Sequence, residues 1–170
     1  MKPEESRYQK EDMAEAIAEL RAGKIISFSD ECGKWLACDA CNETTVTQLS
    51  TGLNAHVLID HPGKLSTYVN ELPDTAWDLM EMSEKPLIIY LSDIRNLANA
   101  ISGKQSETGF RMTTDKFAID LCTRYRKPLF VCAFTESATE VFHTQYSCAK
   151  KAKLSKIRID SRNRFSIIEQ

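Results

Sequence analysis

The chain has 170 residues, 42% of them hydrophobic, which fits one globular domain with a sizeable core and argues against two independent domains. Its 22 basic and 24 acidic residues give a formal net charge of -2, so any polyanion site has to be local rather than a product of bulk charge. No stretch approaches the roughly 18 uninterrupted apolar residues of a membrane span, and the charged N-terminal segment lacks the apolar core of a signal peptide. We therefore expect a cytoplasmic protein with no membrane partner.

The first part of the chain alternates helix and strand patterns. Met13, Ile17 and Leu20 recur at helical spacing before Gly23, a typical helix stop, and they predict the first helix. Apolar, β-branched runs then predict strands separated by a short helix. In chain order we expect a helix over 10–22, strands over 24–29 and 34–38, a helix over 43–50 and a strand over 56–60.

The rest of the chain continues this alternation. The run PLIIYL has the strongest pattern of a buried strand, and Thr114 with Asp115 can start a helix that buries Phe117 and Leu121. We expect a helix over 72–82, strands over 86–91 and 109–113, a helix over 114–125, a strand over 128–134, a helix over 138–149, and a closing hairpin of KIRID and RFSII about 161–163.

This order of elements predicts one α/β domain over residues 1–170, with residues 1–9 as a flexible N-terminal extension. Its sheet should be twisted and mixed, with parallel and antiparallel strands flanked by helices. A wholly parallel sheet is disfavoured because several connections are too short for crossover helices.

The first predicted strand ends in a polar run that is typical of a binding or capping turn. Ile25 and Ile26 form its buried part, and Ser29, Asp30 and Glu31 then follow in succession. The turn after this strand is therefore the first place to expect a ligand.

Two cysteines, Cys38 and Cys41, form a Cys-x-x-Cys pair with Cys32 nearby, which raises a zinc or redox interpretation. A structural zinc site needs a second pair, and a thioredoxin-like pair opens a helix after a strand, whereas Cys38 lies in a predicted strand. Because most of the six cysteines lie in apolar runs, we interpret them as buried free thiols and predict no metal site.

The three histidines, His56, His61 and His143, are far apart in the sequence, so a histidine-centred triad or metal site is not expected. Each is interpreted as a surface or strand-end residue. His61, close to Gly63 at a strand exit, is the histidine best suited to line a pocket.

The C-terminal part is rich in basic residues and admits two interpretations. The cluster could contact phosphates, with Tyr146 and Phe165 nearby for stacking. Alternatively, its lysines keep a solvated edge hairpin from pairing with another sheet, and this second interpretation is the favoured one. The cluster consists of Lys150, Lys151, Lys153, Lys156, Arg158, Arg162 and Arg164.

Four segments carry a resemblance: SDECGKWLACD, EKPLIIYL, GFRMTTDKFAIDLCTRYRKPLFV and RFSII. Together they resemble the YrdC-like family, which includes the threonylcarbamoyl-AMP synthases of tRNA modification. The third segment is the most specific match, because it keeps Arg111, Asp115 and the run from Lys127 to Leu129 at the family's separations. The resemblance covers residues 10–168 and implies the family's α/β fold.

The resemblance implies a reaction in which threonine, bicarbonate and ATP give threonylcarbamoyl-AMP and pyrophosphate. Such chemistry needs fixed cations around the triphosphate, but no Lys or Arg occurs from Leu49 through Pro62, where the family carries them. Trp35 stands where the family has glycine, and Asp30 falls in its Pro-Thr turn. We therefore predict that the synthase activity is lost.

What remains is a set of candidate nucleotide- or substrate-binding residues, without an assigned catalytic residue. Arg111 matches the family's Arg-Val-Pro strand, and Ser166 falls on its Ser-Thr-Ile strand. The full set is Asp30, Glu31, Arg111, Thr135 and Ser166. The leading hypothesis is a translation-related YrdC-like protein that binds nucleotide or tRNA in the context of threonylcarbamoyladenosine biosynthesis.

Two alternatives stay open. In the first, the chain is an active synthase-like nucleotidyltransferase with a rebuilt site, in which Asp30 and Glu31 hold a Mg²⁺ ion beside ATP. In the second, Trp35 and Phe134 fill the former cleft, and the chain is a non-catalytic protein-interaction module. The sequence identifies neither a protein partner nor an oligomeric state.

Overall fold

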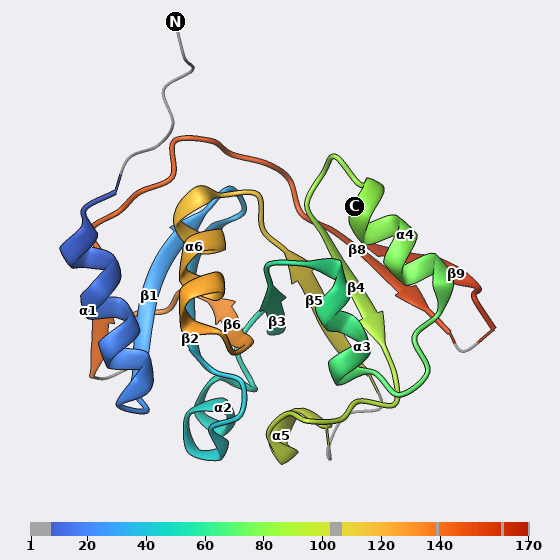
Figure 1. The fold of residues 1–170 in the computed structure, drawn as a ribbon, viewed down its shortest axis with the longest axis horizontal. Coiled ribbons are helices and arrows are strands. Elements are labelled where there is room, and N and C mark those ends of the chain that lie inside the picture. Colours follow the sequence, from blue (N-terminus) through green and yellow to red (C-terminus); the bar gives the residue numbers. More distant parts are fainter. Residues whose placement is uncertain (1–7, 103–106, 139, 161, 170) are drawn as a thin grey trace, which may run out of the picture.

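The computed structural model describes residues 8–102, 107–138, 140–160 and 162–169. Most of the extension predicted over residues 1–9 lies outside the described residues, as does Ser161 in the predicted hairpin turn. The described elements form an α/β fold in which helices flank one long sheet (Figure 1).

The sheet contains the strands β1 (Ile25–Asp30), β2 (Gly33–Asp39), β3 (His56–Ile59), β4 (Leu87–Leu91), β5 (Thr108–Met112), β6 (Leu129–Ala133), β7 (Val141–His143), β8 (Ser155–Ile159) and β9 (Phe165–Glu169). Their order is β7-β1-β2-β6-β3-β5-β4-β8-β9. The pairs β1–β7, β3–β5 and β4–β8 are parallel, and the other five pairs are antiparallel. This arrangement confirms the mixed sheet, including the predicted closing hairpin of β8 and β9.

The helices are α1 (Lys10–Arg21), α2 (Glu43–Leu49), α3 (Leu65–Tyr68), α4 (Asp74–Met82), α5 (Asn99–Ser102) and α6 (Lys116–Tyr125), with a 3-10 turn η1 (Pro62–Lys64). The sequence predicts α1, α2, α4 and α6 to within a few residues, whereas the short elements η1, α3 and α5 were not predicted. Side-chain caps fix two of the starts: Asn42 accepts from the backbone N–H of Thr45 at α2, and Asp115 accepts from that of Ala118 at α6.

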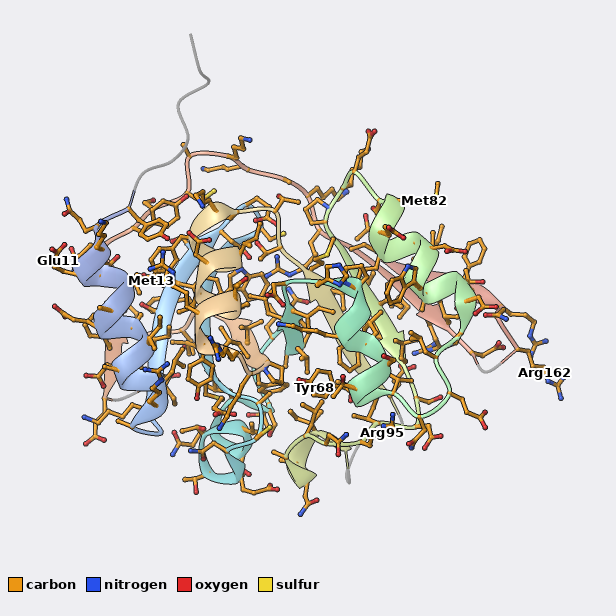
Figure 2. The ribbon with its side chains drawn as sticks, viewed as in Figure 1. Glu11, Met13, Tyr68, Met82, Arg95 and Arg162 are labelled. Carbon is orange, nitrogen blue, oxygen red and sulfur yellow. The ribbon has the colours of Figure 1, made fainter. Side chains whose placement is uncertain are left out.

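Alternation of side chains along the strands divides the core into two parts. On one face, α1 and α6 pack against a cluster that includes Trp35 from β2. On the other face, α2 to α5 pack against a cluster that includes its neighbour Leu36. Helix α1 has one buried and one exposed face: Met13 is fully buried, whereas Glu11 is exposed (Figure 2).

The helix predicted over 138–149 is wrong. The structure has the short strand β7 there, followed by an extended segment over residues 144–154, called the strap below, which runs from beside α1 to β8 (Figure 1). The Asp12 carboxylate on α1 accepts hydrogen bonds from the backbone N–H groups of Gln145 and Tyr146 at 3.0 Å. These long-range partners satisfy backbone groups that a helix would bond internally, so tertiary contacts override the local pattern.

Candidate functional site

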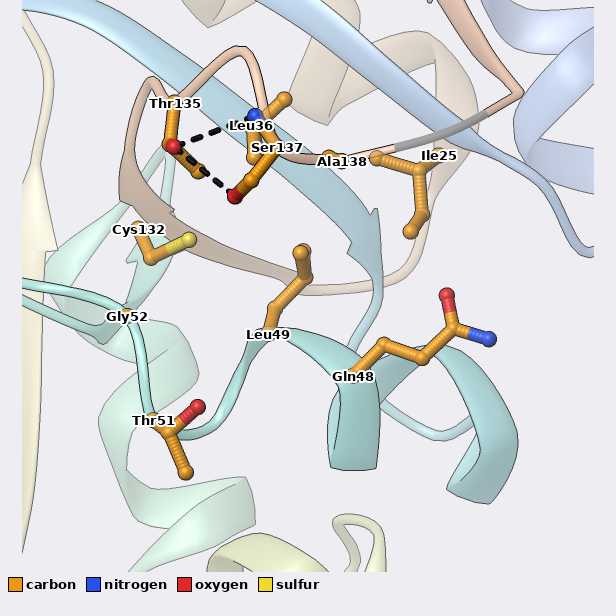
Figure 3. A pocket seen from close by; sticks show the side chains of 10 residues that line it. All are labelled: Ile25, Leu36, Gln48, Leu49, Thr51, Gly52, Cys132, Thr135, Ser137 and Ala138. Atoms are coloured by element: carbon orange, nitrogen blue, oxygen red, sulfur yellow. Dashed lines mark hydrogen bonds between the residues drawn. The ribbon is translucent and has the colours of Figure 1, made fainter.

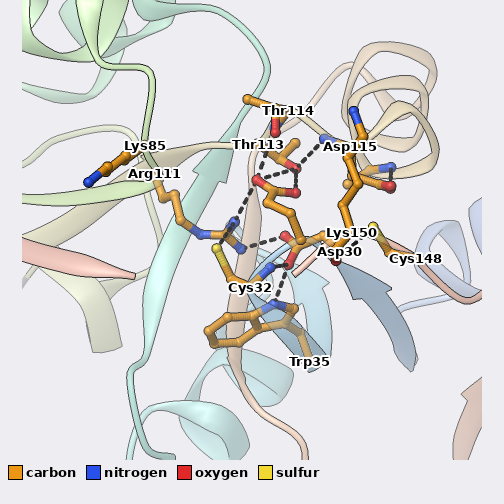
Figure 4. A network of polar contacts seen from close by, with 12 residues as sticks. Asp30, Cys32, Trp35, Lys85, Arg111, Thr113, Thr114, Asp115, Cys148 and Lys150 are labelled. Atoms are coloured by element: carbon orange, nitrogen blue, oxygen red, sulfur yellow. Dashed lines mark hydrogen bonds and ion pairs between the residues drawn. The ribbon is translucent and has the colours of Figure 1, made fainter. Parts of the chain in front are cut away.

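Three strands bring a cluster of polar side chains to the face of the sheet that carries α6 (Figure 4). Asp30 ends β1, Trp35 lies on β2 and Arg111 lies on β5, while Glu31 occupies the turn between β1 and β2. The turn is tight, with Asp30 paired to Gly33. The φ of Gly33 is 134°, a conformation that residues with a side chain rarely adopt, so the turn requires glycine there.

Arg111 is fully buried, and its guanidinium is surrounded by groups that bind a cation. Nη2 lies 2.7 Å from Asp30 Oδ2, an ion pair that is not aligned as a hydrogen bond, and Nη1 lies 3.6 Å from Glu31 Oε1. Nε donates to His56 Nε2 at 2.9 Å, and the guanidinium carbon lies 5.0 Å from the centre of the Trp35 ring. The protein therefore neutralises this cation with its own groups.

Both carboxylates of the cluster have further donors. Asp30 Oδ1 accepts from a backbone N–H of the turn at 2.9 Å and from Trp35 Nε1 at 2.8 Å. Glu31 accepts from the Thr113 hydroxyl at 3.0 Å and from the Thr114 N–H at 3.0 Å. The carboxylates are thus held by protein donors as well as by the guanidinium.

These residues do not fit the Mg²⁺ site of the rebuilt-synthase hypothesis. Mg²⁺ requires oxygen ligands in near-octahedral geometry, whereas the oxygens of Asp30 and Glu31 already face Arg111 and hydrogen-bond donors. Within the described parts of the chain, no group of three or more His, Cys, Asp or Glu side chains is placed to hold a metal ion.

His56 is a buried member of the cluster: it is a strand-end residue, one of the two expected alternatives, and it is not a surface residue. It begins β3 and is 0% exposed. Its Nδ1 lies 2.7 Å from the carbonyl oxygen of Asn54 and therefore carries the proton, which leaves Nε2 to accept from Arg111. Burial and the charge of Arg111 lower the pKa of His56 well below its ordinary value, so the imidazole is neutral.

The strap covers the cluster from outside. The backbone N–H of Ala152 donates to the carbonyl oxygen of Glu31 at 2.7 Å. Near the start of the strap, the Tyr146 hydroxyl donates to the Asp115 carboxylate at 2.6 Å, and the Tyr146 ring stacks on Phe117 of α6. Within this closed region, Asp30, Glu31 and Arg111 are 3%, 4% and 0% exposed.

The structure brings Asp30, Glu31 and Arg111 together but places Thr135 and Ser166 elsewhere. Thr135 follows β6, is exposed, and lines a separate hollow on the other face of the sheet. Ser166 is exposed on the edge strand β9, and the strand order separates β9 from β5 by β4 and β8. The sequence pattern missed His56, because only the sheet order reveals that β3 lies beside β5.

The two aromatic residues expected to fill the family's cleft have different positions. Trp35 is 3% exposed and lies against Arg111 and His56, so it does occupy the interior of the cluster. Phe134 lies apart from the cluster and is half-buried, with the Lys34 ammonium 3.9 Å from the centre of its ring.

Of the remaining sequence candidates, Cys32 touches the cluster, because its Sγ accepts from Arg111 Nη1 at 3.5 Å. His61 is exposed and caps η1 by accepting from the Gly63 N–H at 2.9 Å. All six cysteines are free thiols, and burial raises the pKa of Cys38 to about 12. Cys41 is exposed, which corrects the expectation that its thiol is buried.

A family model described as "Telomere recombination", the Sua5/YciO/YrdC model, matches residues 18–163. The chain belongs to this family. Its fold is accordingly YrdC-like, and the chain is related to the threonylcarbamoyl-AMP synthases. A comparison with curated protein sequences finds no match.

Solved structures show the same YrdC-like fold at low sequence identity. P. abyssi Sua5, crystallised with L-threonine, is 16% identical with a TM-score of 0.76, over 90% of this chain and 52% of that chain. E. coli YciO is 15% identical with a TM-score of 0.74, over 95% of this chain and 90% of that chain. MTH1692 from Methanobacterium thermoautotrophicum is 15% identical with a TM-score of 0.72, over 100% and 91%. This chain spans about half the length of Sua5.

Among the described residues, none of the helices combines the length and apolar character that crossing a bilayer requires.

Proposed function

We propose that this chain is a YrdC-like domain that binds RNA and does not make threonylcarbamoyl-AMP. The observation that carries the proposal is the environment of Arg111, the arginine that matches the family's Arg-Val-Pro strand. Its guanidinium is fully buried and paired with Asp30 and Glu31. A synthase has to hold a triphosphate between fixed cations, and this cation already faces two carboxylates.

The charges around the cluster also oppose ATP binding. The segment from Leu49 through Pro62 has no Lys or Arg, and the next cation along the chain, Lys64, pairs with Asp60. Turning Arg111 toward a phosphate would leave its carboxylate partners buried without a cation, at a cost of about 3–5 kcal/mol. The proposed loss of synthase activity is therefore supported by the carboxylates around Arg111 as well as by the lack of Lys and Arg from Leu49 through Pro62.

Support for RNA binding comes from a basic surface made of Lys85, Lys150, Lys151 and Lys153. The last three lie on the strap, and Lys85 lies just before β4. All four are exposed, and within the described part of the chain none of them forms an ion pair. Free lysines of this kind can follow a phosphate backbone.

A hollow of about 440 Å³ adjoins this basic surface. It is lined by Lys85 and Lys153 together with Ser155 and the apolar side chains Ile157 and Ile167. Phe165 lies two residues from Ile167 on β9, hence on the same face, and its side chain is 61% exposed. Proteins that bind single-stranded RNA use this combination: the cations contact phosphates, and the exposed aromatic ring stacks on a base.

Not every basic or aromatic residue of the C-terminal part contributes to this surface. Arg158 pairs with Glu107 at 2.5 Å, and Arg164 pairs with Asp160 at 2.9 Å. Tyr146 is buried against α6 rather than free for stacking. The proposal therefore rests on the four lysines and Phe165.

The catalytic part is tested by measuring pyrophosphate release from ATP with L-threonine and bicarbonate, alongside an active synthase of the family. We expect no release above the protein-free rate. Steady turnover by the wild-type chain would overturn this part of the proposal, and loss of that turnover in Arg111→Lys would assign it to the cluster.

The binding part is tested by fluorescence anisotropy with a labelled tRNA stem-loop. Replacing Lys150, Lys151 and Lys153 together by Gln should weaken binding at least 10-fold. It should also reduce the slope of log affinity against log salt by about 2, since each lost single-strand phosphate contact accounts for about 0.7. Titration calorimetry with ATP or AMP should give no heat.

The control of equal charge replaces Lys24, Lys116 and Lys127 by Gln, three exposed lysines outside the proposed surface. This control should bind RNA like the wild type. Equal loss in the control and the strap variant would show that binding follows net charge rather than the proposed surface. Absence of RNA binding at low salt would overturn the proposal in favour of the interaction module.

A further inference from the structure

A second hollow lies on the face of β2 opposite to the Arg111 cluster (Figure 3). Trp35 and Leu36 are neighbours on β2 and belong to different cores, so Trp35 enters the cluster while Leu36 lines the hollow. The hollow has a volume of about 470 Å³, which is within the ordinary range of small-molecule sites. Strand β2 thus separates a closed charged site from an open one.

The hollow has an apolar floor and a polar rim. The floor consists of Ile25, Leu36, Leu49 and Cys132, which are 4%, 1%, 3% and 1% exposed. The rim carries the hydrogen-bonding groups of Gln48, Thr51, Thr135 and Ser137. The hydroxyls of Thr135 and Ser137 lie 2.9 Å apart, so both stand on the same side of the opening. Apolar walls with a few polar groups are the usual composition of a ligand pocket.

One wall of the hollow is fixed by the backbone. The Leu53 carbonyl accepts from the Ala133 N–H at 2.8 Å, which ties the loop after α2 to the end of β6. Gly52 permits this approach, because a Cβ there would lie 2.5 Å from Cys132 Sγ. This wall of the hollow is therefore held by the protein's own contacts, which lowers the entropic cost of ordering it on binding.

We infer that this hollow binds a small uncharged molecule with an apolar body and hydroxyl or amide groups at its edge, the chemistry of a nucleoside without phosphate. None of the ten lining residues is Asp, Glu, Lys, Arg or His. The Gln48 carboxamide supplies both a donor and an acceptor for a heterocycle edge, and the rim hydroxyls suit a sugar.

The surroundings disfavour a phosphate in this hollow. The lining residues offer no cation to a phosphate, and Glu136 lies between Thr135 and Ser137 in the turn at the rim. Burial raises the pKa of Cys132, which keeps its thiol neutral. This site is also distinct from the basic surface, because its strands β1, β2 and β6 are separated from β8 by β3, β5 and β4.

The test is a titration of the ¹⁵N-labelled full chain with adenosine, followed by amide shifts, with AMP as the charged counterpart. We expect saturable shifts of the Gln48, Thr51 and Ser137 amides, and at least 10-fold weaker binding of AMP. Thr51→Trp should fill the opening and abolish the shifts. Thr44→Trp, at another exposed threonine, which lies on α2 and does not line the hollow, should leave them unchanged.

Several results would overturn the inference: no saturable shift with adenosine, shifts centred on other residues, or equal affinity for AMP. Should Thr51→Trp disturb folding, Ser137→Trp provides a second blocking variant from the opposite side of the rim. The strap variant that lacks Lys150, Lys151 and Lys153 should bind adenosine normally. Failure of RNA binding and failure of this site are therefore separate outcomes.

Discussion

The Arg111 cluster and the β8–β9 hairpin contain the same chemical pair in opposite environments. Arg111 lies 2.7 Å from Asp30, and both side chains are 0% exposed. Arg158 lies 2.5 Å from Glu107, and these side chains are 50% and 26% exposed. The distances are nearly equal, so distance alone does not separate the two pairs.

Burial separates them. Water can solvate either partner of the exposed pair when the other is removed, whereas it cannot reach the buried carboxylates. An arginine that matches the family can therefore bind a ligand only where its charge remains accessible. In this chain Arg111 holds three strands together, whereas the lysines on the strap and before β4 are accessible.

The largest expected effect is that of Arg111→Met. Removing the guanidinium leaves Asp30 and Glu31 buried without their cation, and we expect a loss of about 3–5 kcal/mol in the free energy of unfolding, measured by chemical denaturation. Adding Asp30→Asn to this variant removes one of the stranded charges and should restore part of the loss. A change below about 1 kcal/mol would show that water reaches the cluster.

A smaller loss is expected for Trp35→Phe, which keeps an aromatic ring but removes the indole N–H that donates to Asp30 at 2.8 Å. A hydrogen bond to a charged group contributes about 1.5–3 kcal/mol, and we expect a loss in that range by denaturation. Trp77→Phe is the matched control, because Trp77 Nε1 donates to Glu81 at 2.9 Å in an exposed setting. Equal losses in the two variants would remove the distinction between buried and exposed donors.

Much of the fold was predictable because its signals are local. The apolar run of β4 and the capped, amphipathic α6 each carry their own pattern, and both lie where the sequence predicts them. The strap shows the limit of this approach. Its extended form depends on Asp12, more than 130 residues away in the sequence, which no local window includes.

The candidate site was predictable only in part, for a similar reason. Asp30 and Glu31 stand out as a polar run after a buried strand, and Arg111 stands out through the family resemblance. His56 joins them only because β3 pairs with β5, and the charge balance of the cluster depends on that pairing. The sequence therefore predicts which charged residues belong to the site. Only the structure shows that these residues neutralise one another.

The buried environment should also appear in the pH dependence of stability. The pKa of His56 is lowered on folding, so below pH about 6.5 the unfolded chain binds a proton that the folded chain does not. Above that pH, the free energy of unfolding should not depend on this group. Below that pH, it should decrease by up to about 1.4 kcal/mol for each unit by which the pH is lowered. Denaturation between pH 5 and 7.5 tests this contribution.

The control for this pH effect compares two histidine variants. His56→Gln should remove the slope below pH about 6.5, whereas His61→Gln, at an exposed histidine, should retain it. A slope that persists in His56→Gln would assign the titration to another group.

The smallest effect on the free energy of unfolding is expected for the exposed pair, in the variant Arg158→Gln. Its ion pair with Glu107 is exposed, so solvent replaces the lost contact, and the freed side chains regain conformational entropy. Chemical denaturation should resolve no change in the free energy of unfolding, at low or high salt. A clear, salt-dependent loss would mean that the β8–β9 hairpin depends on this pair, and that an exposed arginine here has the structural role that burial gives to Arg111.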